Sequence, residues 1–294
     1  MLRPHYPTPL TGLLLVFAAT LLASLGVVMQ IDPSRPTELP DVGGQGLAVT
    51  FAFGFVATLA ARRVPAPRPE RIGLQGIDSS FIGVLVALLP FVFLTSEIDN
   101  WLAYWFPPED LEASRAALAE ARANDTPLAI VQRGLFFVGL QPVVSALLIQ
   151  GVVLQGAIAY MGRLPGVLFT SVLGIGTLEL MKGSTVASEM LLPFLGALVL
   201  CLVRVASGSL LAPILLLMGW NAIAIGATVA YEALPIPGFN QLDSFTSPLL
   251  LLVAVASVVL AFTGVARGLG EQPVVLDIEE EPDPAEDEDS GGFF

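Results

Sequence analysis

Residues 134–162 decide the fold, and they read GLFFVGLQPVVSALLIQGVVLQGAIAYMG. No charged side chain interrupts this run, and its apolar residues are continuous instead of alternating with polar ones. About 20 apolar residues are enough for a helix to cross the hydrocarbon core of a bilayer. Within lipid, only helices and closed barrels satisfy all their backbone hydrogen bonds. The run therefore predicts a membrane-spanning helix.

Seven further apolar runs flank this one along the chain. Charged residues set the limits of eight candidate spans, which are residues 9–30, 43–61, 79–96, 134–160, 164–181, 190–204, 209–231 and 246–266. We predict an all-α, polytopic membrane domain of about eight transmembrane helices over residues 1–270. The fifth and sixth spans are short and are separated by a small polar connection at residues 182–189. A re-entrant hairpin is therefore an alternative to two full crossings.

The basic residues indicate the orientation of the spans, because Lys and Arg in short loops stay on the cytoplasmic side of a membrane. If successive spans cross the membrane in alternating directions, a larger set of basic residues lies on one side and a smaller set on the other. The larger set is Arg3, Arg62, Arg63, Arg68, Arg71, Arg163, Arg204 and Arg267, and the smaller set is Arg35, Arg115, Arg122, Arg133 and Lys182. We therefore expect a multi-pass protein of the cell membrane with both termini in the cytoplasm.

The C-terminal residues 271–294 differ from the rest of the chain in composition. They hold ten acidic residues and no basic one, which accounts for most of the net charge of -13. Few apolar groups and high charge cannot offset the entropy of ordering, so we predict a disordered cytoplasmic tail that binds neither anionic lipid nor nucleic acid. The chain ends in Phe293 and Phe294. Two aromatic rings and a free carboxylate on a flexible tether suit docking to a cytoplasmic partner, and the alternative is a purely solvated end.

Ionisable residues inside a membrane are costly and are functional candidates by default. Among the predicted spans only Glu179 qualifies with any force, and the only histidine, His5, precedes the first span. A zinc protease needs converging imidazole or carboxylate ligands, and an aspartyl protease needs two carboxylates that share a proton. A serine protease needs a general base beside its hydroxyl. The spans supply none of these sets, so we expect no metal and no other cofactor.

Three segments in the second half of the chain carry a family resemblance. They are QPVVSALLIQG at residues 141–151, LFTSVLGIGTLE at residues 168–179 and GSLLAPILLLMGWN at residues 208–221. In this order they resemble the CPBP family of intramembrane proteases, which process CAAX proteins and bacteriocins and are also called Abi. That family has a Glu-Glu-x-x-x-Arg-Gly helix, a Phe-x-x-x-His helix, and a Gly-Ser-Leu-x-x-Pro lead into His-x-x-x-Asn. The resemblance covers about residues 128–225 and implies a CPBP-like helical core.

The residues that carry catalysis in that family are replaced here. Aligned on Gly151, the matching positions are Ser145, Ala146, Gln150, Ile175, Glu179, Leu217 and Asn221. Ser145 and Ala146 stand in place of the paired glutamates, and only Asn221 keeps the residue of the family. The resemblance therefore implies a pseudoprotease that binds a membrane partner, a lipidic ligand or a peptide. The alternatives are a small transporter or channel component, or an active membrane peptidase of unusual chemistry.

The same positions also have simpler interpretations. Small residues such as Ser145 and Ala146 let helices approach closely in lipid, and an amide such as Gln150 hydrogen-bonds across helices. Glu179 lies three residues before Lys182, a spacing that brings two side chains together on a helix. If the resemblance holds, one interior cavity is lined by Ser145, Gln150, Glu179, Leu217 and Asn221.

Overall fold

The computed structural model describes residues 5–32, 34, 41–106, 126–182, 187–231, 233–241 and 244–271, without the side chains of residues 176–189 and 271. Within this part the chain is helical, apart from turns and one isolated bridge between Pro237 and Gln241. The predicted acidic tail, with Phe293 and Phe294, lies outside the described residues.

Among the described residues, seven helices are long and apolar enough to cross a membrane, which confirms the all-α, polytopic prediction. They are α1 (Pro9–Val28), α2 (Val42–Ala61), α4 with α5 (Ser79–Leu88 and Phe91–Trp105), the continuous stretch from α7 to α9 (Pro127–Met161), α11 (Ala187–Ser207), α12 (Leu211–Val229) and α13 (Pro248–Glu271). The short helix α3 (Arg68–Ile72) lies between α2 and α4. The described apolar part of α10 (Arg163–Lys182) is shorter, so the predicted count of eight spans is not reached by the described residues.

Polar residues start the helices where the sequence passes from a loop into an apolar run. The side chains of Thr8, Asp41, Asp78 and Thr126 accept hydrogen bonds from backbone N–H groups in the first turns of α1, α2, α4 and α7. Such caps satisfy donors that a helix start leaves unpaired. Pro90 divides α4 from α5 because it has no N–H to continue the helical hydrogen bonds.

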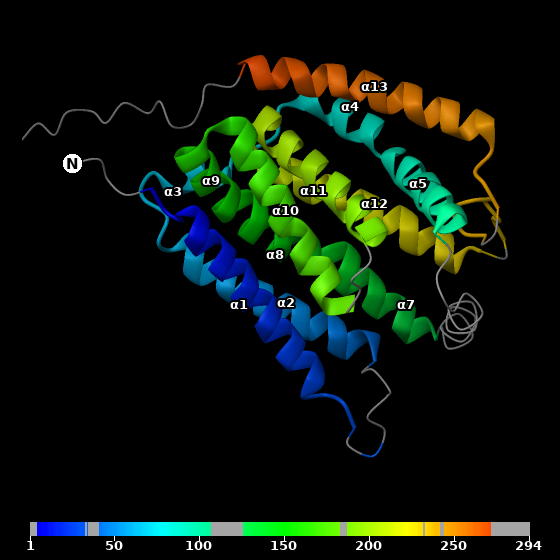
Figure 1. Ribbon diagram of the computed structural model, residues 1–294, viewed down its shortest axis with the longest axis horizontal. Helices are drawn as coiled ribbons and strands as arrows, with labels where there is room; N and C mark the ends of the chain where they lie inside the picture. Colours follow the sequence, from blue (N-terminus) through cyan, green and yellow to red (C-terminus); the bar gives the residue numbers. More distant parts are fainter. Residues whose placement is uncertain are drawn as a thin grey trace, which may run out of the picture.

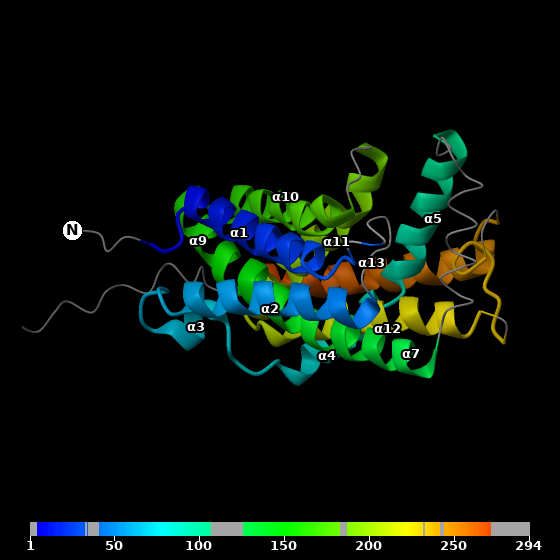
Figure 2. The same cartoon turned by 90° about the horizontal axis from the view of Figure 1, so that it is seen from below.

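The long helices lie side by side, and the two ends of the described chain lie at the same end of the bundle (Figure 1). Helix α1 packs against α2 and α10 (Figure 2), and α13 packs against α4 and α11. Helices α10 and α11 also pack against each other. They hold 20 and 21 residues, so each is roughly 30 Å long. That length matches the thickness of the hydrocarbon core of a bilayer.

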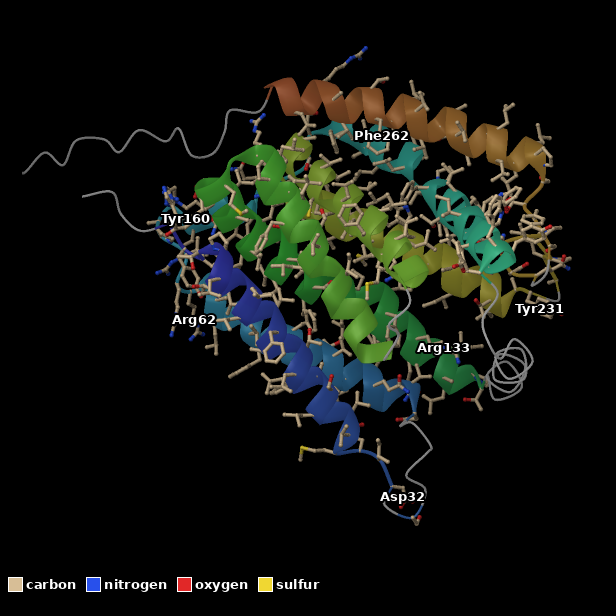
Figure 3. All side chains as sticks on the ribbon, viewed as in Figure 1. Asp32, Arg62, Arg133, Tyr160, Tyr231 and Phe262 are labelled. Atoms are coloured by element: carbon tan, nitrogen blue, oxygen red, sulfur yellow. The ribbon has the colours of Figure 1, made fainter. Side chains whose placement is uncertain are left out.

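Described arginines of the larger basic set, among them Arg62, Arg163 and Arg204, lie at the end of the bundle where the described chain begins. Arg62 and Tyr160 lie at this end, and Arg133 and Tyr231 lie toward the other (Figure 3). The guanidinium group of Arg163 donates to the carbonyl of Leu269 at 2.7 Å, which ties the start of α10 to the end of α13. We refer to this region as the arginine end.

The structure corrects the predicted end of the third span. Helix α5 continues to Trp105 and not to residue 96, so Glu97 lies inside a candidate span and is only 8% exposed. Its Oε2 accepts from the backbone N–H of Thr246 at 2.8 Å. The interpretation of Glu179 as the one ionisable residue within the spans is therefore wrong. In the sequence, the charge of Glu97 indicates the end of the third span. In the structure, the segment before α13 covers the Glu97 carboxylate and donates a hydrogen bond to it.

Candidate ligand cavity

A cavity of about 610 Å³ lies between α2, α11, α12 and the central helix, the continuous stretch Pro127–Met161. Its polar lining residues are Gln45, Arg133, Gln141, Ser145, Gln150 and Asn221. Its apolar lining includes Phe137, Ile149, Leu200, Leu217 and Trp220. Arg133 is the only charged residue of the described lining. The volume falls within the range of about 300–1,000 Å³ that is typical of small-molecule pockets.

The central helix supplies a straight row of lining residues at four-residue spacing. The row consists of Arg133, Phe137, Gln141, Ser145 and Ile149. Two π-helical segments, η1 (Gly134–Leu140) and η2 (Leu147–Val153), flank the α-helical segment α8 (Gln141–Ala146). One α-helical turn takes about 3.6 residues, so residues four apart rotate slightly forward around the axis of an α-helix. A π-helical turn takes more than four residues, so the same spacing rotates slightly backward. Because the two helix types alternate, their drifts cancel and the row stays on one face.

Asn221 closes a gap in the backbone hydrogen bonds of the central helix. Gln141 donates its N–H to the carbonyl of Phe136, five residues earlier. In the same register the next residue, Pro142, would pair with the carbonyl of Phe137, but proline has no N–H. Asn221 Nδ2 on α12 donates to this carbonyl at 2.6 Å. The amide therefore pins α12 to η1 at the wall of the cavity.

The structure brings together four of the seven positions that the family resemblance singled out. Ser145, Gln150, Leu217 and Asn221 line the cavity from α8, η2 and α12. The Ser145 hydroxyl donates to the carbonyl of Gln141 at 2.7 Å and keeps its lone pairs as acceptors. Gln150 is 5% exposed and lies deep in the bundle, close to Cys201.

The other three positions lie elsewhere or outside the described side chains. Ala146 is buried on another face of the central helix, in an apolar cluster with Leu210 and Ile214. Ile175 is not among the lining residues, although its neighbour Gly174 is. The side chain of Glu179 is outside the described part of the structure.

A second, smaller pocket of about 260 Å³ lies beside the cavity, between α5, α11 and α12. Trp220 and Gly196 line both spaces, so they form the wall between them. The indole Nε1 of Trp220 donates to the carbonyl of Leu88 at 3.0 Å, which holds the ring in this wall. A Cβ built on Gly196 meets no atom within 4 Å. Gly196 is therefore a position where a larger side chain fills empty space.

Three lining residues were not predicted as site residues from the sequence, namely Gln45, Arg133 and Gln141. The four-residue row is a signal that links Arg133 and Gln141 to Ser145, but it points to one face only when the π-helical segments are known. Gln45 comes from α2, and no sequence pattern connects it with the central helix.

The described lining can hold a ligand by hydrogen bonds and one positive charge. Four of its residues carry side-chain amides, namely Gln45, Gln141, Gln150 and Asn221. Within the described residues, no group of three His, Cys, Asp or Glu side chains is placed to hold a metal ion. This lining is suited to binding.

Comparisons with protein-family models, with curated proteins and with solved structures find no match to this chain.

Proposed function

We propose that this chain is a multi-pass protein of the cell membrane that binds an amphiphilic ligand in the cavity, with an apolar body and a polar or anionic head. The observation that carries this proposal is the combination of about 610 Å³ of interior space, a mostly apolar wall and a single cationic side chain, Arg133. Apolar walls with a few placed polar groups are typical of sites for small molecules.

The distribution of polar groups suggests how such a ligand lies. Arg133 ends α7 and Gln45 lies in the first turn of α2, so both stand near the end of the bundle opposite the arginine end. An anionic or hydrogen-bonding head fits here, close to the level of lipid headgroups. The apolar body then extends toward Leu200 and Leu217, with Gln150 at the inner end of the space.

We also propose that the ligand-binding core is CPBP-like and has lost its catalytic residues. Support comes from Ser145, Gln150, Leu217 and Asn221, which the resemblance assigns to one site and which line one cavity. In this proposal the arginine end faces the cytoplasm, in keeping with the preference of arginine for that side. A transporter is the alternative, and it would require the cavity to open toward the arginine end in another conformation.

The fluorescent fatty acid cis-parinaric acid is a suitable probe, because it is an anionic amphiphile and accepts energy from tryptophan. We expect saturable binding to the purified full-length protein, with energy transfer from Trp220. Gly196→Leu should weaken binding by tenfold or more, since its side chain fills the cavity. It should not destabilise the helix, because leucine has a higher helix propensity than glycine by roughly 0.8 kcal/mol.

Gly83→Leu is the matched control, since Gly83 is also helical and has no atom within 4 Å of an added Cβ, but lies away from the cavity on α4. It should bind the probe like the unmodified protein. Equal affinities for Gly196→Leu and Gly83→Leu would show that the probe binds elsewhere. Flux of the probe that is faster in proteoliposomes than in protein-free liposomes would favour the transporter.

A further inference from the structure

Arg204 carries a buried charge at the arginine end and is not among the described lining residues of the cavity. It lies in the last turn of α11 and is 6% exposed. Its guanidinium group packs against Gly73, which follows α3 and has a φ of 82°, and a Cβ at Gly73 would collide with it. The Arg204 side chain is therefore enclosed between α11 and the end of α3, and it is shielded from solvent.

The buried guanidinium group has few partners. Arg204 Nη2 donates to the carbonyl of Arg71 over a long 3.4 Å, and Arg204 Nε is buried without an acceptor. Arginine has five N–H donors. The Nε atom of Arg71, on the neighbouring α3, is also buried without an acceptor. Two arginines, one on α3 and one on α11, therefore each carry an unpaired buried donor, and the backbone of the first contacts the guanidinium group of the second.

No acidic side chain compensates these charges within the described part of the chain. The acids of this region, Glu70 and Asp78, are exposed, and the carboxylate of Asp78 accepts from the backbone N–H of Ser80. A buried charge without a partner is strongly unfavourable. An anion at this junction would remove that cost.

We propose that Arg71 and Arg204 bind a phosphate group at the junction of α3 and α11. Planar guanidinium groups match the geometry of phosphate oxygens better than ammonium groups do. The junction lies at the end of the bundle, at the level expected for lipid headgroups, and basic pockets between helices bind anionic headgroups there. The phosphate belongs either to an anionic phospholipid or to a free phosphate ion. This proposal is independent of the ligand in the cavity.

The test measures binding of phosphatidylglycerol to the full-length protein in detergent, by native mass spectrometry at increasing lipid concentration. We expect one tightly held phosphatidylglycerol, and weaker retention of the uncharged lipid phosphatidylcholine. Arg71→Gln and Arg204→Gln should each weaken binding by about tenfold, the effect of losing one charge-assisted hydrogen bond. Arg71 is only half-buried, so Arg71→Gln keeps the test valid if Arg204→Gln fails to fold.

Arg62→Gln is the matched control, because Arg62 is an exposed arginine at the same end. It should retain the lipid, and so should Gly196→Leu, whose loss of the cavity ligand is a separate effect. If inorganic phosphate displaces phosphatidylglycerol at equal concentration, the phosphate site holds and its source is the free ion. Equal weakening by Arg62→Gln and Arg71→Gln would overturn the proposal, since it would indicate a diffuse surface charge.

The acidic tail offers a competing countercharge. In a full-length variant, the nine acids of residues 272–294 are changed to their amides. Unchanged lipid binding by this variant supports the phosphate site. Lipid binding that occurs only in this variant would overturn the proposal, because the tail would then occupy the junction in the natural chain.

Discussion

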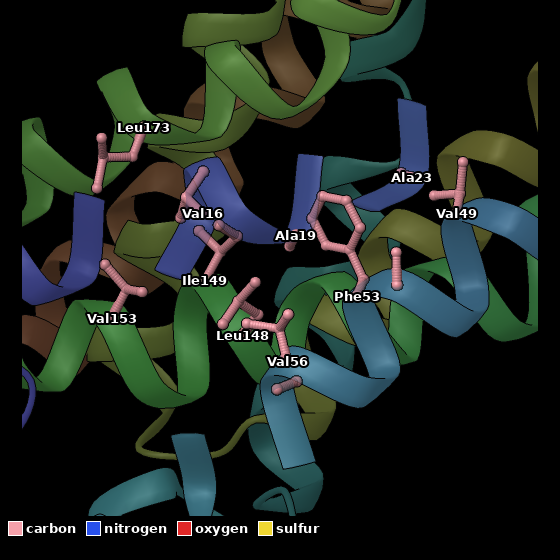
Figure 4. Close-up of a cluster of buried hydrophobic side chains, with 12 residues drawn as sticks. Val16, Ala19, Ala23, Val49, Phe53, Val56, Leu148, Ile149, Val153 and Leu173 are labelled. Atoms are coloured by element: carbon pink, nitrogen blue, oxygen red, sulfur yellow. The ribbon is translucent and has the colours of Figure 1, made fainter. Parts of the chain in front are cut away.

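The two faces of the central helix pack in opposite ways. Toward α1 and α2 its residues Leu148, Ile149 and Val153 pack into a buried apolar cluster, which includes the completely buried Ala19 and Ala23 (Figure 4). Toward α11 and α12 it meets larger and polar residues, and a cavity of about 610 Å³ separates the helices. Helices in lipid associate through close van der Waals packing, which small residues permit. The comparison indicates that the first face stabilises the fold and the second is open for binding.

Residue Ile149 marks the boundary between the two faces. It belongs to the apolar cluster with α1 and α2, and it also lines the cavity. Its neighbour Leu148 is completely buried in the packed cluster. Adjacent positions of one helix therefore serve the scaffold and the site, which predicts very different effects for similar substitutions on the two faces.

The largest effect is expected for Leu148→Ala on the packed face. Removing a fully buried leucine side chain leaves a void among rigid neighbours and costs about 2–5 kcal/mol in protein cores. We expect the Tm in detergent to fall by roughly 5 °C or more. Leu217→Ala is the control on the cavity face, because Leu217 is only partly buried and its truncation enlarges an existing space. Similar Tm losses for the two variants would contradict the division into a packed and an open face.

A smaller effect is expected for the hydrogen bond that fixes α12 beside the cavity. Asn221→Leu should leave the Phe137 carbonyl unpaired and cost about 1 kcal/mol. Pro142→Ala restores an N–H in the central helix, and this N–H can pair with the same carbonyl. Asn221→Leu should therefore cost less in the Pro142→Ala background.

The four proteins of this double-mutant cycle are compared by unfolding in detergent. A coupling free energy of roughly 0.5–1 kcal/mol is expected for an interhelical hydrogen bond of this kind. If Asn221→Leu costs the same with proline and with alanine at position 142, the amide does not substitute for the missing backbone donor.

Much of the scaffold could be predicted from the sequence, because it depends on local composition. Continuous apolar runs predicted the helices, and the arginines of the larger set predicted which helix ends lie together. The end of α5 could not be predicted in this way. Glu97 looks like a boundary in the sequence, and only the distant segment that contains Thr246 makes it a buried residue.

The site was partly predictable for a different reason. The three motifs singled out Ser145, Gln150, Leu217 and Asn221 among other positions, and these four line the cavity. A sequence motif does not distinguish an α-helix from a π-helix. The row of lining residues that includes Arg133 could therefore not be predicted from the motifs. The π-helical segments depend on tertiary partners such as Asn221, whose amide replaces a donor that Pro142 lacks.

The smallest expected effect lies outside both faces, at the start of α4 near the arginine end. The Asp78 carboxylate accepts from the backbone N–H of Ser80 at 2.9 Å, and hydrogen bonds with Ser80 hold the pKa of Asp78 below its ordinary value of 3.8. A carboxyl group whose folded pKa is lowered contributes stability at pH values above 3.8, and this contribution is lost as the pH falls through the folded pKa. Asp78→Asn keeps a capping side chain but cannot titrate. We therefore expect the Tm difference between the unmodified protein and Asp78→Asn to be constant near neutral pH and to shrink below pH 3.8. The control is the Tm difference between Leu148→Ala and Leu217→Ala, which should be the same at every pH because both are apolar substitutions. If the Tm difference between the unmodified protein and Asp78→Asn also stays constant through the acid range, Asp78 is not a charged cap.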